Sequence, residues 1–429
     1  MPAKASGHLT LAARFAETML CIWIATFSIG ITKFLSVPIK TLVFLAFIAT
    51  AVRALLERNR ITIKFRYSLL ILGTWVVVAS LVGILNGFDL STLNQGTSLV
   101  ATFLVVIFSI LLHENGLLSA DKLKAVVYST AVAGAVIKVI LGLGVVFGIF
   151  SADGLDQAMQ DYAGSTSFST DSFGGFLGLL PRIGNAGDLF NLIVFLFFIR
   201  ESRGVKVAVV WTILLMFTLV TYSRYLMLFF SIATVYASAS NLKNRSKAMS
   251  VAITVLLLSI LLWYSDASVI YSEIENRFTG QVQLESDSIR SEMKGLLFKA
   301  FDDNPFVGLG IGGYIRNYLR SPTNLWQYEL EYLSLLMQLG IIGFFAIVLN
   351  FIAYVIRMLF QNHERALRIP MIIGTLFWIG TPMQSSLFSG TQSALIVISM
   401  YFLSRKSGAR RMEHRASPRT VIDQSNSTK

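Results

Sequence analysis

Long apolar runs, separated by short clusters of charge, are the feature of this sequence that most limits how the chain can fold. A helix that crosses a bilayer needs about 20 mostly apolar residues. Twelve segments approach this length, at 17–34, 38–56, 67–86, 96–113, 123–149, 174–199, 205–222, 225–241, 248–264, 328–356, 368–386 and 389–404. Only 14% of the 429 residues are charged, against about 25% in a typical soluble protein. The pattern predicts an all-α fold, a polytopic membrane helix bundle of about 12 transmembrane helices.

Basic residues follow the even-numbered segments. Residues 53–66, after the second segment, and residues 405–411, after the twelfth, are rich in Lys and Arg. Odd-numbered segments lead instead into polar or acidic stretches such as 86–89 and 153–171. Because Lys and Arg mark the cytoplasmic loops of membrane proteins, we expect both termini to lie in the cytoplasm. This topology accounts for the net charge of +12, so we expect no nucleic-acid partner.

The same topology divides the chain into two parts. Residues 1–404 are interpreted as one integral membrane domain, in which residues of about 265–327 form a long extracytoplasmic loop. Residues 405–429 are interpreted as a basic cytoplasmic tail, disordered because it is polar and carries few apolar residues.

The long loop contains a helical pattern. Its apolar residues recur on one helical face: Ile289, Met293, Leu296, Leu297, Ala300 and Phe301. Residues 302–305 (Asp-Asp-Asn-Pro) end the pattern. We expect an amphipathic helix at the outer membrane–water interface, with Arg290 and Lys294 on its polar face over the mouth of a substrate site.

Metal binding and disulfide formation find no support in the sequence. Cys21 is the single cysteine and lies in the first apolar segment. The four histidines (His8, His113, His363 and His414) show no spacing typical of metal ligands. We expect neither a metal nor another cofactor.

Charged residues at the rim of membrane spans are costly and are candidates for function. Arg182 precedes the apolar part of the sixth segment, Arg224 lies in the short outer turn between the seventh and eighth, and Arg277 and Arg290 lie in the long loop. Arginines at an external mouth suit an anionic ligand. The alternatives are an Arg182–Asp188 pair at the surface and, for Arg224, a helix-end anchor.

A glycine-rich segment, residues 304–314 (NPFVGLGIGGY), follows the helical pattern. Its spacing resembles a dinucleotide-binding loop, but no strand–helix unit surrounds it. We therefore interpret it as a tight backbone turn. Glu329, Glu331 and Tyr332 come next, and then Gly340 opens the sequence Gly-Ile-Ile-Gly.

In this order, the glycine-rich segment, Glu-Leu-Glu-Tyr-Leu at 329–333 and Gln-Leu-Gly-Ile-Ile-Gly at 338–343 resemble the signature of bacterial O-antigen polymerases, O-antigen ligases and related exopolysaccharide polymerases. Pro-Arg-Ile-Gly-Asn at 181–185 and the Tyr-Ser-Arg turn at 222–224 are similar to further landmarks of that family. The resemblance implies glycosyl transfer at the outer face of the bacterial inner membrane. The donor is a sugar chain on polyprenyl pyrophosphate, and neither a nucleotide sugar nor a metal takes part.

Roles for the arginines follow from this implied chemistry. Arg182 and Arg224 would hold the pyrophosphate, because a guanidinium binds phosphate oxygens with two donors and keeps its charge. We expect Arg224 to be catalytic and to stabilise the charge that develops on the leaving group. Arg290, Arg277 and Tyr314 complete the predicted substrate-binding set.

The acceptor hydroxyl needs a base, and Glu329 or Glu331 would serve, because partial burial raises the pKa of a carboxylate. The alternative is that both only pair with the arginines. The ligase branch commonly has a His near this position, but the residue eleven places before Gly340 is Glu329. This departure favours a polymerase over a ligase.

Three functions are therefore open. The first is a polymerase of lipid-linked repeat units for O-antigen, capsule or exopolysaccharide, with the lipid bilayer and a chain-length regulator as its other partners. The second is an O-antigen ligase. The third is a lipid-linked oligosaccharide flippase or secondary transporter, which would place charges near the bilayer midplane, where only Lys138 clearly lies.

Overall fold

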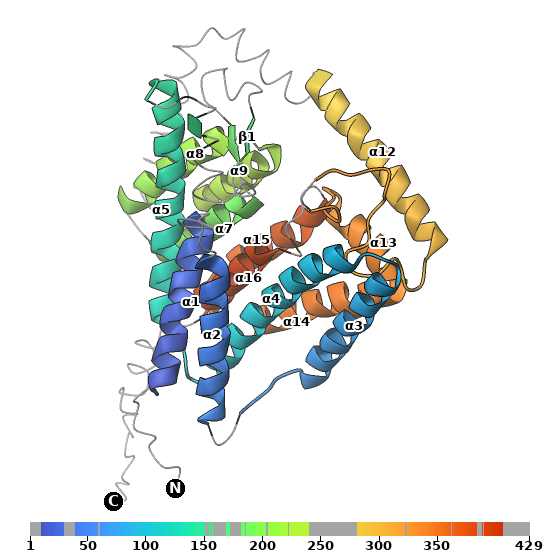
Figure 1. Cartoon of the computed structure of the whole chain (residues 1–429). Coiled ribbons are helices and arrows are strands. Elements are labelled where there is room, and N and C mark those ends of the chain that lie inside the picture. The colour runs from blue at the N-terminus through green and yellow to red at the C-terminus, as the bar shows by residue number, and fades with distance from the viewer. Residues whose placement is uncertain are drawn as a thin grey trace, which may run out of the picture.

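The computed structural model of the chain describes most of the predicted membrane domain. The described residues are 10–29, 39–58, 61–149, 151, 154–155, 157, 169–171, 182–184, 186–202, 205–221, 223–239, 281–321, 324–361, 363–383, 388 and 390–405. Within them the fold is a helix bundle (Figure 1). Apart from one pair of three-residue strands, the regular elements are helical, as the sequence predicts.

Five helices form the first part of the bundle: α1 (Leu11–Ile29), α2 (Ile39–Leu56), α3 (Arg66–Leu85), α4 (Asp89–Glu114) and α5 (Ala120–Val146). Figure 1 shows α1, α2 and α5 side by side on one flank, with α3 and α4 on the other. Each helix is apolar along most of its length, so in a bilayer its outward side can face lipid.

The second part includes a helix that is buried along most of its length. Its elements are β1 (Ser169–Asp171), β2 (Arg182–Gly184), η3 (Ala186–Asp188), α7 (Leu189–Glu201), α8 (Val205–Thr221) and α9 (Arg224–Ala239). The strands pair antiparallel, with Asp171 opposite Arg182. Helix α7 is buried on nearly every side, because it packs against α5, α8, α9, α15 and α16.

The remaining elements are α12 (Gln281–Asp303), α13 (Glu331–Gly343), η4 (a π-helix, Phe344–Leu349), α14 (Asn350–Phe360), η5 (Arg365–Leu367), α15 (Arg368–Gly380), η6 (Thr381–Met383) and α16 (Thr391–Leu403). Helix α16 lies between the two flanks, in contact with α1, α4, α5 and α7 (Figure 1).

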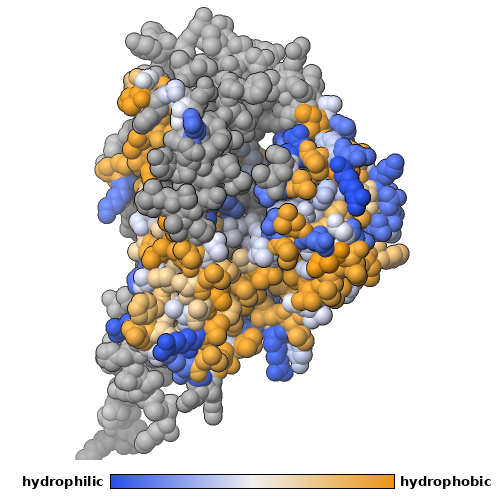
Figure 2. Space-filling view, viewed as in Figure 1, coloured by the Kyte–Doolittle hydropathy of each residue, from blue (hydrophilic) through white to orange (hydrophobic). Residues whose placement is uncertain are grey.

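Seven helical stretches among the described residues are long and apolar enough to cross a membrane: Leu11–Ser28, Ile39–Leu56, Arg66–Leu85, Asp89–Glu114, Ala120–Val145, Glu331–Phe360 and Arg365–Met383. Helices α8, α9 and α16 add shorter apolar stretches. Apolar residues cover the middle of the face in Figure 2, and hydrophilic ones lie at its lower edge and around α12. The chain is thus a multi-pass membrane protein. The total of about 12 spans stays a prediction, since the segment at 248–264 lies outside the described residues.

Polar side chains join the helix ends that the sequence assigns to the cytoplasm. Glu114 contacts Lys64 (2.6 Å) and Arg405 (3.7 Å). Lys124 donates to the Arg405 carbonyl oxygen (2.6 Å) and lies 3.5 Å from Glu201. Arg405 is buried here, so the bundle includes this residue, which the sequence assigns to the tail.

Helix α12 confirms the helical pattern at 289–301 and the stop that follows, since it ends at Asp303. Its predicted surroundings are wrong. Met293 and Leu297 are fully buried against Tyr328 and Met337 of the same chain. Protein rather than the membrane–water interface therefore covers this apolar face, and α12 is fixed against α13.

Candidate active site

Helix α13 is broken at Gly340, where the backbone is not helical and φ is positive (φ 62°, ψ −177°). A break inside an apolar helix frees backbone groups that need new partners. The glycine-rich segment supplies them through four hydrogen bonds: Leu309 N to Met337 O (3.1 Å), Gly310 N to Gln338 O (2.7 Å), Ile341 N to Pro305 O (2.8 Å) and Ile342 N to Phe306 O (3.2 Å). The glycine-rich segment and the Gln-Leu-Gly-Ile-Ile-Gly stretch at 338–343 are therefore joined in one hydrogen-bonded unit.

The other face of the glycine-rich segment lies directly on the backbones of α3 and α4. A Cβ atom on Gly310 would lie 2.0 Å from the Gly83 nitrogen, and one on Gly312 would lie 2.2 Å from the Thr92 nitrogen. Both glycines have positive φ angles, of 87° and 83°. The prediction of a tight backbone turn is confirmed, and the close approach explains why side chains are excluded.

Two buried glutamines fix this segment in place. Gln95 accepts from the Gly312 nitrogen and donates to the side-chain oxygen of Gln338 (2.7 Å). Gln338 in turn donates to the Gly313 carbonyl (2.9 Å). Sequence reasoning missed both residues. For Gln338 the available signal was an amide inside an apolar run, which is costly unless it is hydrogen-bonded. Gln95 lies in a polar stretch and carries no such signal.

Arg290, on α12, and Arg320, in the loop that follows, converge on Glu329. Arg290 Nε lies 3.1 Å from Glu329 Oε2, and Arg320 Nη2 lies 3.1 Å from Glu329 Oε1. All three side chains are about one-third exposed, at 31%, 35% and 39%. We name these three residues the Glu329 cluster. It confirms that Glu329 pairs with an arginine, and it adds Arg320, which the sequence analysis did not select.

Glu331 lies two residues further on, in different surroundings. It is the first residue of α13, it is buried, and its carboxylate accepts a hydrogen bond from the Phe388 backbone nitrogen. It also lines a small pocket that has room for about one water molecule. The other lining residues are Gln95, Trp326, Gln327, Tyr328, Ser334 and Leu335. The two predicted bases are therefore two residues apart in sequence but have different partners.

Tyr328 is the other ionisable group in this pocket. Its hydroxyl accepts from the Ile315 nitrogen (2.8 Å) and donates to the Tyr318 carbonyl (3.1 Å). Burial raises the pKa of Tyr328, so the phenol stays protonated at neutral pH. Of the two, Glu331 is the group that can take a proton.

The remaining predicted residues fall into two groups. Tyr314 packs edge-on against Phe88, with ring centroids 5.1 Å apart, so it joins the glycine-rich segment to α4. Arg182 is paired through its backbone in β2, and Arg224 begins α9. The side chains of these two arginines, and the whole of Arg277, lie outside the described residues.

The comparison with protein families covers this part of the molecule. Residues 182–348 match the family described as O-antigen ligase. This match places residues 182–348 in the O-antigen ligase/polymerase superfamily. No curated protein and no solved structure matches it. The resemblance read from the sequence is confirmed, and the superfamily match spans all seven predicted site residues without separating polymerase from ligase.

Within the superfamily region, two tyrosines bring the neighbourhoods of Arg224 and Glu331 to one place. The Tyr225 hydroxyl donates to the Phe377 carbonyl, and the Tyr332 hydroxyl donates to the Ile379 carbonyl (2.8 Å). Each tyrosine directly follows a predicted catalytic residue. The end of α15 therefore holds the start of α9 beside the start of α13.

A buried ion pair anchors the start of the superfamily region to α5. Lys138 binds Asp188, and both side chains are more than nine-tenths buried. Asp188 directly precedes α7, four residues after β2. The alternative pairing of Arg182 with Asp188 stays a prediction, because the Arg182 side chain lies outside the described residues.

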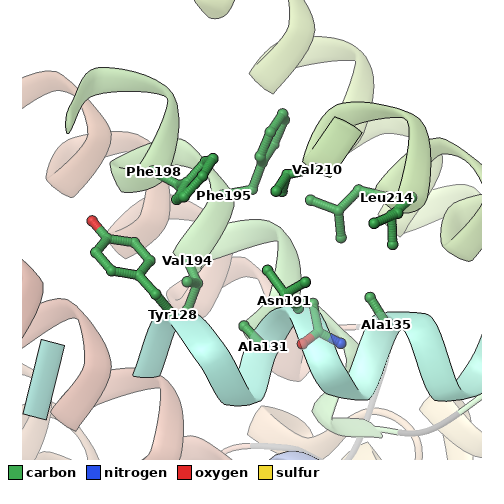
Figure 3. Close-up of a pocket in the computed structure, with 11 residues that line it drawn as sticks. Tyr128, Ala131, Ala135, Asn191, Val194, Phe195, Phe198, Val210 and Leu214 are labelled. Atoms are coloured by element: carbon green, nitrogen blue, oxygen red, sulfur yellow. The ribbon is translucent and has the colours of Figure 1, made fainter. Parts of the chain in front are cut away.

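A second pocket lies next to this ion pair, between α5, α7 and α8 (Figure 3). It is small, with room for about one water molecule, and its walls are apolar except for Tyr128 and Asn191. Tyr128 donates to Glu201 at one end. The pocket has no cationic group to receive a phosphate, so it does not compete with the Glu329 cluster as the candidate site.

Proposed function

We propose that this protein joins polyprenyl-pyrophosphate-linked oligosaccharide repeat units into a surface polysaccharide at the outer face of the bacterial inner membrane. The observation that carries the proposal is the position of the Glu329 cluster beside the Glu331 pocket, inside the superfamily region. Two cations at an accessible surface suit the pyrophosphate, and a buried carboxylate in a pocket suits the acceptor hydroxyl.

In the proposed reaction, an acceptor hydroxyl oxygen attacks C1 of the donor sugar. The bond between C1 and the pyrophosphate oxygen breaks, and polyprenyl pyrophosphate leaves with the bonding electrons. Glu331 takes the proton of the hydroxyl. Arg290 and Arg320, together with Arg182 and Arg224, stabilise the negative charge of the leaving group.

Glu329 has a different role in this scheme. Its two carboxylate oxygens hold the guanidinium groups of Arg290 and Arg320 in the arrangement that two phosphate oxygens would need. When the pyrophosphate arrives, it competes with Glu329 for both arginines. The cluster thus keeps the anion site formed before the substrate binds.

Alanine at both Arg290 and Arg320 is expected to reduce long-chain polysaccharide by at least about tenfold, because each charge-assisted hydrogen bond contributes about 1.5–3 kcal/mol. The measurement is rescue of a gene-deletion strain of the native host, with the polysaccharide separated on a gel. Arg316→Ala is the matched control, since Arg316 lies exposed in the same loop. Immunoblots verify equal amounts of each variant.

The same deletion strain tests the reaction itself. Loss of long chains, with single repeat units still attached, supports a polymerase, and failure of Arg224→Ala to rescue would assign that residue to it. Complete loss of attached sugar supports a ligase or a flippase. The buried Lys138–Asp188 pair is the one observation that favours a flippase, because transporters place charges inside the membrane. Unchanged polysaccharide would contradict the proposed function.

A further inference from the structure

Exposure changes abruptly along the span that contains α13. None of residues 331–340 is exposed, because α12, η6 and the glycine-rich segment pack around them. Large apolar side chains become exposed only beyond the break, and the first are Ile341, Ile342 and Phe345. In a chain that crosses a membrane, the exposed apolar side of a span faces lipid. The lipid-facing part of this span therefore begins at Ile341 rather than at Glu331.

The turn at Phe306 and Val307, which follows α12, lies at the same level. The Ile342 nitrogen donates to the Phe306 carbonyl (3.2 Å), and a Cβ on Gly340 would lie 2.4 Å from the Phe306 carbonyl carbon. The backbone of the turn thus lies on α13, while the side chains of Phe306 and Val307 are 66% and 47% exposed. Irregular backbone is tolerated at membrane depth when protein covers it. The turn meets this condition and exposes apolar side chains.

The length of the span sets this level near the edge of the hydrocarbon region. Glu331–Phe360 has 30 residues, or about 45 Å at about 1.5 Å per residue, whereas the hydrocarbon core is about 30 Å thick. Arg357 carries a charge in the last turn of α14, and Gly340 lies about 25 Å from it along the axis. Because charged groups avoid the hydrocarbon, the break and the turn lie near its boundary on the α12 side, and Glu331 lies beyond it.

The residues just before the turn mark the water side of this boundary. Residues 302–304 (Asp-Asp-Asn) are exposed, and two residues later the exposed side chains are those of Phe306 and Val307. An ionised carboxylate is costly in hydrocarbon, whereas an apolar side chain gains free energy by leaving water. The switch from one kind to the other is therefore expected where a chain passes from water into lipid. Together with the exposed residues from Ile341 onward, the turn forms one apolar surface that continues the lipid-facing side of the span.

We propose that Phe306 and Val307 insert into the bilayer leaflet on the α12 side, which the sequence assigns to the outside, and that lipid acyl chains are the partner of this surface. The membrane contact expected for the apolar face of α12 is then made by the turn that follows the helix. Because α12 ends three residues before Phe306, the inserted turn fixes the height of α12 and of the Glu329 cluster above the hydrocarbon region. The insertion does not depend on the reaction that the cluster serves.

The accessibility of a spin label to oxygen and to a nickel chelate tests the insertion. The full-length protein, with its single cysteine removed by Cys21→Ala, is reconstituted in lipid vesicles with one nitroxide at Phe306→Cys or Val307→Cys. Asp303→Cys supplies the water-facing reference, and Phe345→Cys supplies the lipid-facing one. Oxygen enters the hydrocarbon and the polar chelate is excluded from it, so the ratio of their collision rates at the turn should exceed that at Asp303→Cys by at least about threefold.

Two results would overturn the proposal. A ratio at the turn equal to that at Asp303→Cys would place the turn in water. Spectral broadening at the turn that disappears when labelled protein is diluted with unlabelled protein would show that a second copy of the chain, not lipid, covers this surface. Should Phe306→Cys not fold, Val307→Cys alone decides. The measurement needs no turnover, so a failure of the proposed function would leave this result unaffected.

Discussion

Gly310→Ala is expected to destabilise the protein by about 2–5 kcal/mol and to abolish polymerisation. The new Cβ would lie 2.0 Å from the Gly83 nitrogen and 2.3 Å from the Gly83 Cα. Both are backbone atoms, so no side chain can turn away to relieve the overlap, and overpacking alone costs about 1–3 kcal/mol. The positive φ angle of 87° adds about 1–2 kcal/mol for any residue with a Cβ. Thermal unfolding of the detergent-solubilised protein measures the effect.

Two other glycines serve as controls. Gly87 has a similar φ angle of 78°, but a Cβ there would meet nothing within 4 Å, so Gly87→Ala should cost only about 1–2 kcal/mol. Gly295 lies inside α12 in open space, and Gly295→Ala should stabilise the helix by about 0.5–1 kcal/mol. If Gly310→Ala destabilises the protein no more than Gly87→Ala does, the close contact with α3 is not as described.

Lys138→Met should destabilise the protein by about 3–5 kcal/mol. Removal of one partner from a buried ion pair is strongly destabilising because the other charge stays buried after losing that contact, and Asp188 is 3% exposed. Loss of the anchor would also free the start of α7 from α5, so rescue of polysaccharide synthesis should fall. Thermal unfolding and the deletion-strain assay measure the two effects.

A double-mutant cycle separates the pair from the rest of its surroundings. Lys138→Met with Asp188→Asn removes both charges, so it should be more stable than Lys138→Met alone. Lys206→Met, an exposed change on α8, should shift stability by less than about 0.5 kcal/mol. If the double variant is less stable than Lys138→Met alone, the buried charges do not interact as the structure indicates.

The sequence predicted the helices well because the length of an apolar run is a local property. Eleven of the twelve segments contain a helix among the described residues, and the segment at 248–264 lies outside them. The segment at 174–199 was predicted too long, since α7 begins at Leu189. Periodicity also identified the apolar face of α12. It could not show that Met293 and Leu297 would pack on Tyr328, because both a membrane and a protein surface suit an apolar face.

The candidate site was predicted in part. Glu329 and Arg290 were selected because charges at the rim of spans are costly, and the structure pairs them. Arg320 and Trp326 lie in a loop without periodicity, so no local pattern distinguished them. Gln95 and Gln338 are 243 positions apart, and a contact of that separation leaves no local mark in a single sequence.

The contacts of the glycine-rich segment also limit which parts of the chain can be exchanged between relatives. The matched region begins at Arg182, yet Gly83, Thr92 and Gln95, on which the segment rests, all precede it. The region is therefore not a transplantable module, since its central turn is built against two helices outside its borders. A chimaera that exchanges residues 182–348 between relatives should assemble only when α3 and α4 come from the same parent.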